Sequence, residues 1–512
     1  MALSFIPEFA KNIPSSWLWI GAAGWVSYWV IKICYRLFLH PYAKYPGPRI
    51  AAVSELWYAY HWFSGRYPWA IEAAFKQYGD AVRIAPNELA FFRVEAQTDI
   101  LMAGTNKGRP PFIKTELQRI RGKHAGIAAD PDPESHRVVR KMLAPAFNPR
   151  ALREQEPALH VHIDNFIGKL EKLAGEEPAD MREWFDWLAC DIAGDMCYGH
   201  DFRNVEREKS SLFLSTFRRV GLWGTLHQVF WRFPILYPLV FLMLPPRLAT
   251  VIPTILRENN TIVTDRVARR GKLPHPDYFS LLVKDDGEAP DRDFLVAQAN
   301  HLIVGGFDPD TNLFTSAVHF LLVNPDLLKK LQSEVRDRFA SYSEITGDTV
   351  QDLPWVNAVI DESLRVHTNG AFGLPRISPG AVVDGHYIPK GCRVQTSIFA
   401  TSKSERYFTR AREFCPQRWL PAGHPDYEVS FDKDDKSSFK PFSMGPRGCI
   451  GQNMGYLQAR LVLTKMAWRL DWDHANAGEV DWERDSRLYA IWEKPPVLVR
   501  FKPNAIAFGQ GK

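Results

Sequence analysis

The stretch Phe442-Ser-Met-Gly-Pro-Arg-Gly-Cys-Ile-Gly451 places one cysteine, Cys449, in a glycine-rich loop directly before an amphipathic segment that starts near Gln452. The glycines allow tight turns and let the backbone approach a flat ligand closely. Helix-terminal N–H groups lower the pKa of a nearby thiol, so Cys449 is a candidate anionic metal ligand. Arg447 can pair with a carboxylate of that ligand. A small buried cysteine is the alternative, and it leaves Phe442 and Arg447 unexplained.

These residues match the FxxGxRxCxG signature, so the chain resembles the cytochrome P450 superfamily. The resemblance implies an iron protoporphyrin (haem) whose axial ligand is the Cys449 thiolate, in a site that includes Phe442, Arg447 and Gly451. It also implies a fold that is mostly α with a minor β portion. No GxGxxG fingerprint appears in the chain, so we expect electrons from NADPH through a separate reductase.

A charged pair, Glu362 and Arg365, lies at a spacing of three on a predicted helix over 353–367. This spacing puts both side chains on one helix face. Most such pairs are exposed and contribute little to stability. By resemblance, Glu362, Arg365 and Arg418 form a buried structural triad behind the haem loop.

Haem carries two propionates, which need fixed cations in a half-buried setting. The resemblance implies that His136 and Arg140, four residues apart, supply two of these contacts. Arg376 and Arg447 are expected to supply the others. For His136, a solvated helix face is the alternative.

The central helix departs from the family pattern (A/G)Gx(D/E)T(T/S), because the chain reads Val304-Gly-Gly-Phe-Asp-Pro-Asp-Thr311. The acid is retained as Asp308, but Pro309 replaces the threonine. Proline has no N–H and opens the helix locally. We therefore take Asp308, Asp310 and Thr311 as candidate catalytic residues, with a substrate hydroxyl as another replacement for the missing group. The alternative is that Pro309 only enlarges a distortion that the family already has.

The expected reaction is monooxygenation of a lipophilic secondary metabolite such as a polyketide, terpene or alkaloid. Segments of the chain, 108–114 and 132–147, look like those of filamentous-fungal members. The missing threonine leaves desaturation or oxidative rearrangement open, with no oxygen retained. A non-catalytic haem sensor or carrier is a third alternative. Substrate contacts are expected, by region, from 112–127, Phe307, 367–372 and 488–492, where apolar residues predominate.

The N-terminal part predicts a membrane anchor, because residues 17–39 are almost wholly apolar or aromatic and long enough to cross a bilayer. A cleaved signal peptide is the alternative, but no small-residue cleavage site follows. Basic residues on the C-terminal flank place the rest in the cytosol. We expect a single-pass protein of the endoplasmic reticulum membrane. The predicted parts are a short segment (1–16), a transmembrane anchor (17–39), a proline-rich neck (40–50) and a haem-thiolate catalytic domain (51–512).

Composition excludes other classes of protein. The 512 residues carry a net charge of +5, too small to indicate nucleic-acid binding, and 46% of them are apolar. Six cysteines without paired spacing indicate reduced thiols.

The apolar run over 230–244 is broken by prolines, which leaves core packing and membrane contact both open. Helices are predicted over 151–173, 181–199, 248–270, 291–323, 325–340, 353–367 and 452–468, with strands over 81–84, 89–94 and 394–399.

Overall fold

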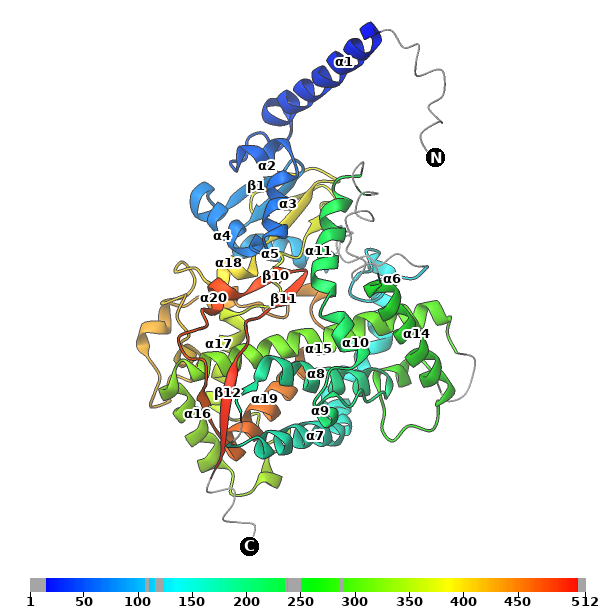
Figure 1. The fold of residues 1–512 in the computed structure, drawn as a ribbon. Helices are drawn as coiled ribbons and strands as arrows, with labels where there is room; N and C mark the ends of the chain where they lie inside the picture. Colours follow the sequence, from blue (N-terminus) through cyan, green and yellow to red (C-terminus); the bar gives the residue numbers. More distant parts are fainter. Residues whose placement is uncertain are drawn as a thin grey trace.

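The computed structural model describes residues 15–105, 110–115, 123–175, 177–234, 237, 250–284 and 289–504. Helices make up most of these residues, and the short strands gather mainly toward one end of the molecule (Figure 1). The prediction of a mostly α fold with a minor β portion is confirmed.

Seven long helices form the body, and each agrees with its predicted range to within a few residues. Polar caps explain several boundaries: the Asn148 side chain accepts from the Ala151 N–H, and Asp291 caps the central helix through the Asp293 N–H. The long helices are α7 (Pro149–Lys172), α8 (Met181–Tyr198), α14 (Val251–Ala268), α15 (Arg292–Leu322), α16 (Pro325–Arg338), α17 (Pro354–Val366) and α19 (Gln452–Arg469).

Shorter helices surround this body. They are α2 (Arg49–Val53), α3 (Leu56–Phe63), α4 (Tyr67–Tyr78), α5 (Val94–Leu101), α6 (Pro133–Leu143), α9 (Asn204–Arg207), α10 (Leu212–Phe217), α11 (Val220–Trp231), α18 (Ile398–Ser402) and α20 (Trp482–Asp485).

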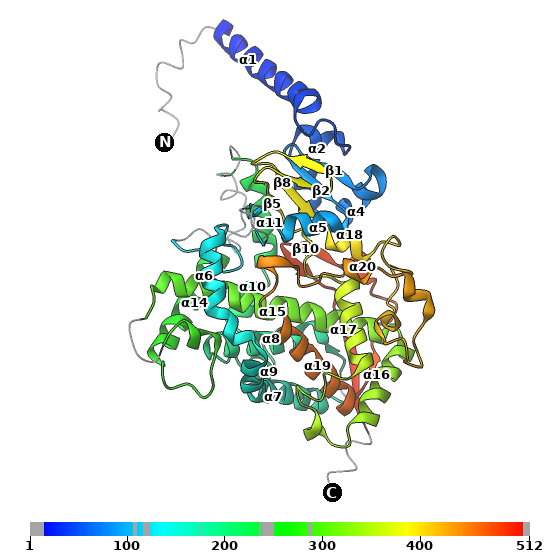
Figure 2. The same ribbon diagram turned by 180° about the vertical axis from the view of Figure 1, so that it is seen from behind.

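The central helix α15 organises the core, since it packs against α8, α14, α17 and α19. Figure 2 shows α17 and α19 on the rear side of α15. From Asp310 to Leu322 every residue of α15 is buried, so its C-terminal half is enclosed by other helices. Buried apolar surface of this extent is the main source of stability in such a fold.

A five-stranded sheet has the order β1-β2-β8-β5-β3. β2 pairs parallel to β8, and the two-residue strand β3 pairs antiparallel to β5 with Lys114 opposite Arg376. The other strands form two hairpins and a three-stranded sheet. The strands are β1 (Ala81–Ala85), β2 (Glu88–Phe91), β3 (Ile113–Lys114), β4 (Ala179–Asp180), β5 (Arg376–Ile377), β6 (Ala381–Val383), β7 (His386–Ile388), β8 (Arg393–Thr396), β9 (Leu470–His474), β10 (Arg487–Tyr489), β11 (Ile491–Glu493) and β12 (Leu498–Pro503).

Two predicted strands are too long. Val94 begins α5, and the segment after Thr396 turns into α18. Ser397 explains the second boundary, because its side chain accepts a hydrogen bond from the Ala400 N–H and caps that helix. A run of β-branched and aromatic residues does not reveal such a cap.

At the N-terminus, α1 (Ser15–Cys34) continues into a π-helix, η2 (Tyr35–Leu39), and projects away from the body (Figure 1). Among the described residues no helix combines the length and the hydropathy that a bilayer span needs. The predicted transmembrane helix is therefore not shown. Most of the predicted 1–16 segment lies outside the described residues.

Candidate haem site

The loop before α19 is held tightly by its own backbone. The Cys449 N–H donates to the Phe442 carbonyl at 2.9 Å, and Gly451 occupies the N-cap position of α19. Gly445 has a φ of 72°, and a Cβ there would collide with the Leu101 carbonyl oxygen. Only glycine fits this position, as the sequence pattern indicates.

The Cys449 side chain is exposed beside this loop. Solvent reaches the sulfur, but protein surrounds it on enough sides that burial raises the pKa of the thiol. The Gly451 N–H lowers that pKa, and Arg140 adds a smaller effect in the same direction. The predicted net lowering of the thiol pKa is therefore wrong for the protein alone. A bound iron cation would itself deprotonate the thiol.

A group of like charges, which we name the cation cluster, lies beside the loop. Its members are Lys114, Arg140, Arg376 and Arg447, with His136 among them. Burial, followed by the charge of Arg376, lowers the pKa of Lys114 to about 7. Burial and the charge of Arg447 lower the pKa of Arg376 to about 10.

His136 is 4% exposed and has no charge of its own at neutral pH. Burial and the charges of Arg447, Lys114 and Arg140 lower its pKa to about 3. In the protein alone His136 is therefore a neutral imidazole, and its contact with a propionate stays a prediction. A neutral imidazole can still donate one hydrogen bond to a carboxylate.

The cation cluster borders a cavity lined by Lys114, Phe372, Leu374, Arg376 and Arg447, together with Thr115, Pro375 and Ser443. Some guanidinium groups are anchored to the backbone: Arg140 donates to the Gly448 carbonyl and Arg447 to the Asp130 carbonyl, both at 2.7 Å. Arg376 is buried and the other three cations are half-buried, so positive charges gathered at this place indicate an anionic ligand. The two haem propionates fit this requirement, and the thiol of Cys449 fits the iron.

Lys114 was not predicted to belong to this site. Its sequence neighbours, Phe112 and Ile113, form no motif that marks a ligand. The lysine reaches Arg376 only because β3 pairs with β5, more than 260 residues apart in sequence. Short two-residue strands give almost no periodic signal, so no pattern in the sequence could have found this contact.

The charged group behind the loop is fully buried and fully paired. Arg365 donates through Nε and Nη2 to the two oxygens of Glu362, each at 2.8 Å. Arg418 Nε lies 3.2 Å from Glu362 Oε1 and also pairs with Asp434. All of these side chains are 0% exposed. The structure thus brings Glu362, Arg365 and Arg418 together, and Trp419 adds a hydrogen bond to Glu362 at 2.9 Å.

The central helix continues through Pro309, and the candidate catalytic residues face two sides of it, with Asp308 and Thr311 toward Asp186 and Asp310 toward α19. The Thr311 hydroxyl donates to Asp186 of α8 at 2.6 Å. Asp310 faces α19, where a Cβ on Gly455 would lie 3.5 Å from its Oδ1, and burial raises its pKa to about 7. Asp308 accepts from Asn312 at 3.4 Å. The structure therefore does not gather these residues in one pocket.

One polar contact to the proline was not predicted. The Asn369 side-chain amide donates to the Pro309 carbonyl at 3.2 Å. Asn369 comes from the segment after α17, which the sequence analysis assigned to substrate contact. The amide thus holds the segment after α17 against α15 beside the proline.

The predicted substrate-contact segments are only partly described. Residues 116–122 of the first segment lie outside the described residues, as does most of the separate apolar run over 230–244. Phe307 packs edge-on against Phe217 with ring centroids 4.8 Å apart. Trp492 is 5% exposed and donates to the Thr368 carbonyl at 3.1 Å. Aromatic side chains thus line this side of α15.

Comparison with known proteins identifies the family. The family described as Cytochrome P450 matches residues 50–498. The chain is 39% identical to cytochrome P450 monooxygenase poxC of Penicillium oxalicum, over 93% of this chain and 92% of that one. It is 38% identical to cytochrome P450 monooxygenase TwmD of Talaromyces wortmannii, over 94% of each chain. A third relative, cytochrome P450 monooxygenase btcC of Colletotrichum orbiculare, is 34% identical over 92% of this chain and 91% of its own.

Proposed function

The chain belongs to the cytochrome P450 family, and from this premise we propose that it monooxygenates a lipophilic secondary metabolite, a polyketide, terpene or alkaloid. It is an oxidoreductase of the monooxygenase type, and the family uses thiolate-bound haem with electrons from a redox partner. The observation that carries the proposal is the Cys449 thiol beside the cation cluster. Together they match two parts of a haem, the iron at its centre and the propionates at its edge.

The residues of the chain have separate tasks in this function. Cys449 would hold the iron, while Lys114, Arg140, Arg376 and Arg447 would hold the propionates. When bound, thiolate-ligated haem activates dioxygen for transfer of one oxygen atom to the substrate. The side chains of Phe307 and Phe217 form an apolar wall on their side of α15, which favours an apolar substrate.

The test is an incubation of the holoenzyme with NADPH, a cytochrome reductase and a metabolite extract under ¹⁸O₂. Products are found by their mass difference from the substrate. One heavy oxygen atom in the product supports monooxygenation. A product without heavy oxygen contradicts it.

A second candidate function is desaturation or oxidative rearrangement. The observation that favours it is the proline at position 309 together with the orientation of Thr311, whose hydroxyl is bound by Asp186. No threonine hydroxyl of α15 then replaces the one that the family usually has. Pro309→Thr restores it, and a shift of product toward hydroxylation would support this alternative.

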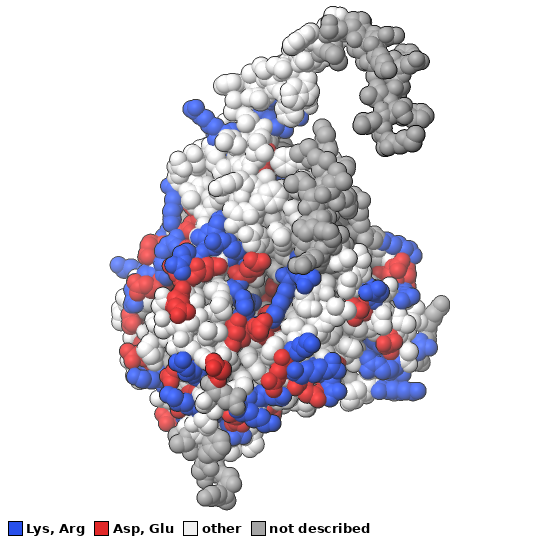
Figure 3. Space-filling view, viewed as in Figure 1, with Lys and Arg blue, Asp and Glu red and all other residues white. Residues whose placement is uncertain are grey.

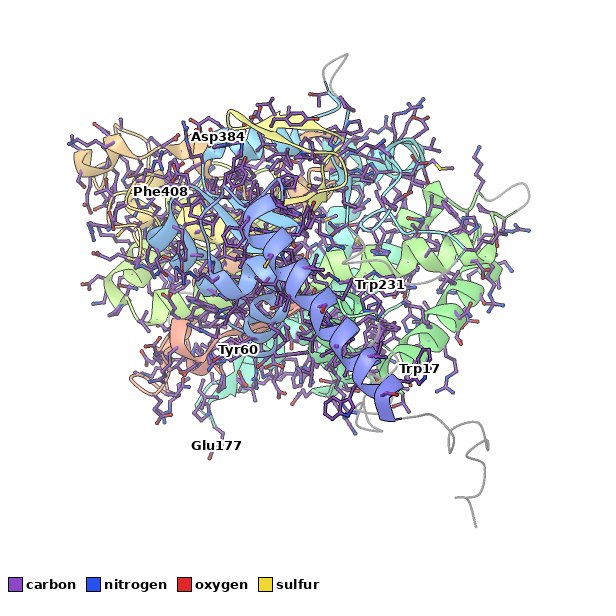
Figure 4. The ribbon with its side chains drawn as sticks, turned by 90° about the horizontal axis from the view of Figure 1, so that it is seen from above. Trp17, Tyr60, Glu177, Trp231, Asp384 and Phe408 are labelled. Atoms are coloured by element: carbon purple, nitrogen blue, oxygen red, sulfur yellow. The ribbon has the colours of Figure 1, made fainter. Side chains whose placement is uncertain are left out.

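We also propose that the chain is attached to the endoplasmic reticulum membrane by its N-terminal part, with the catalytic domain in the cytosol. Exposed apolar side chains support this: Trp19 of α1 is 77% exposed and Tyr60 of α3 is 69% exposed. Figure 3 shows few charges over this end of the molecule. In Figure 4, which looks down on it, Trp17 lies at the outer end of α1. Flotation of the full chain with liposomes, and its loss on replacing Trp17, Trp19 and Trp25 by Ser, tests the attachment.

A further inference from the structure

Two tryptophans in ring contact connect one side of the central helix with the molecular surface. Trp492 of β11 is 5% exposed and lines a cavity of about 360 Å³, whose wall also includes Phe307 of α15. The Trp69 ring of α4 stands edge-on to the Trp492 ring, with the centroids 5.7 Å apart. Figure 1 shows α4, α20 and the β10–β11 hairpin in the same part of the molecule. Trp69 is half-buried, so the two rings lead from the interior to the solvent.

The inner tryptophan lies close to the proline of the central helix. The Trp492 N–H donates to the Thr368 carbonyl at 3.1 Å, and the next residue, Asn369, donates to the Pro309 carbonyl at 3.2 Å. Trp492 is therefore fixed beside the stretch of α15 that carries the candidate catalytic residues.

The two indole N–H groups have different acceptors. The N–H of Trp492 donates to a neutral backbone carbonyl, whereas the N–H of Trp69 donates to Glu483 Oε1 at 2.7 Å. Burial raises the pKa of Glu483, but opposing effects, led by the charge of Lys403, outweigh burial and lower it. Glu483 is therefore a carboxylate at neutral pH and can take a proton at this distance, which a backbone carbonyl cannot.

Arg66 decides in which form Trp69 can be oxidised. The guanidinium carbon of Arg66 lies 3.4 Å from the centroid of the Trp69 ring. A cation is attracted by a neutral indole, but it repels an indole that has become positive by losing an electron. Trp69 therefore holds the oxidised state as a neutral radical, after its N–H proton has passed to Glu483. The Glu483 side chain is 40% exposed, so this proton can reach the solvent.

We propose that Trp492 and Trp69, with Glu483 as the proton acceptor, form an electron route that carries unused oxidising equivalents from the haem site to the surface. The inference goes beyond the proposed function, because it needs bound haem but no particular substrate. Haem supplies one-electron and oxygen chemistry. When peroxide oxidises the site in the absence of substrate, Trp492 gives one electron to the site and Trp69 replaces that electron.

The electrons and protons of this step balance. The N–H bond of Trp69 breaks, its proton moves to Glu483 and then to solvent, and the haem site takes up one proton from water together with the electron. A thiol such as glutathione then gives a hydrogen atom to the Trp69 radical, so the S–H bond breaks and the N–H bond forms again. Two such events leave one disulfide. The thiol is therefore the reductant, and the oxidised haem site is the oxidant.

The first test mixes the substrate-free holoenzyme with hydrogen peroxide, freezes it and records its electron paramagnetic resonance spectrum. The parent should show a neutral tryptophan radical, whose signal narrows when the protein carries ring-deuterated tryptophan. Trp69→Phe and Glu483→Gln should each lower the radical yield about tenfold, since the ring or its proton acceptor is lost.

The matched control is Trp468→Phe. Trp468 is 4% exposed and donates to the Phe339 carbonyl at 3.1 Å, away from the two rings. This variant should keep the parent yield. Absence of a tryptophan radical in the parent, or a parent yield in Trp69→Phe, would overturn the proposal.

The second test follows the haem absorbance and the oxidised peptides during repeated additions of peroxide. Glutathione should slow the bleaching of haem in the parent and lose this effect in Trp69→Phe, where oxygen addition should move to the peptide that contains Trp492. Equal protection by glutathione in both proteins would contradict the route. A product without ¹⁸O would end the proposed function, but both of these experiments contain no substrate and would still decide on the route.

Discussion

The buried group around Glu362 and the partly buried cation cluster differ in whether their charges are balanced. Behind the loop, Glu362 is shared by two arginines at distances of 2.8–3.2 Å. Burial alone would raise the pKa of Glu362, but the charges of Arg365 and Arg418 outweigh burial and lower it. In the cation cluster, by contrast, like charges lower the pKa of Lys114 and Arg376, and Asp130, which raises the pKa of Lys114, offsets only part of the positive charge. Buried charges that balance one another stabilise the fold, whereas an excess of positive charge favours the binding of an anionic ligand.

The largest expected effect concerns Cys449, the proposed ligand of the haem iron. Cys449→Ala should abolish the long-wavelength Soret band of the reduced carbon-monoxide complex, since no thiolate remains to bind the iron. The matched control is Cys392→Ala, which removes a thiol that is 7% exposed and lies outside the loop. It should retain the band. Retention of the band in Cys449→Ala, with haem bound, would mean that another residue is the ligand.

Glu362→Gln should destabilise the protein by about 3–5 kcal/mol, because it leaves Arg365 buried without its counter-charge. Guanidinium unfolding of the haem-free protein measures this loss. Glu428→Gln is the control, since Glu428 pairs with Arg410 at the surface and is 39% exposed. That change should cost less than about 1 kcal/mol. Equal effects of the two substitutions would contradict a structural role for the buried group.

Arg376→Met should have the opposite effect to Glu362→Gln, because it should weaken haem binding and not the stability of the haem-free protein. The haem-free protein should lose no stability, because a repulsive charge is removed, but haem should dissociate about tenfold faster, a change of about 1.4 kcal/mol. Transfer of haem to an acceptor protein measures the rate. Arg500→Met, on the exposed face of β12, should leave the rate unchanged. A loss of stability without faster haem release would assign Arg376 to the fold instead.

The smallest effect is a pH dependence. The folded-state pKa of Lys114 is about 7, below its ordinary value, so the unfolded chain binds more protons between pH 7 and about 10. The free energy of unfolding of the haem-free protein should therefore rise over this range. Solvent contact limits the rise to about 1–2 kcal/mol. Lys114→Met should remove this increment, while Lys329→Met, at a side chain that is 76% exposed, should keep it.

The sequence predicted the structural features that depend only on residues close to one another in the chain. The glycine-rich loop, the start of α19 and the helix that carries Glu362 and Arg365 all follow local spacing, and the structure has them within a few residues. The direction of Thr311 could not be predicted, because it depends on Asp186, 125 positions away on α8.

The same reason explains the other missed contacts. Lys114 and Lys494 stand in or beside short strands, and their partners, Arg376 and Asn312, are 182 or more residues distant in sequence. The sequence around a lysine in such a segment does not distinguish it from a lysine on the solvated surface. The predicted transmembrane span over 17–39 stays a prediction, because no helix among the described residues combines the length and the hydropathy of a bilayer span.

The pairing of β3 with β5 has a consequence for how the protein matures in the cell. Each strand has two residues, and their register puts Lys114 directly opposite Arg376, so like charges oppose the closing of this sheet edge. A slip by one residue would turn the lysine to the other face. Because haem would neutralise both charges, its binding would stabilise this sheet edge and raise the stability of the chain by mass action. We therefore expect haem supply to control how much of the newly made protein escapes degradation.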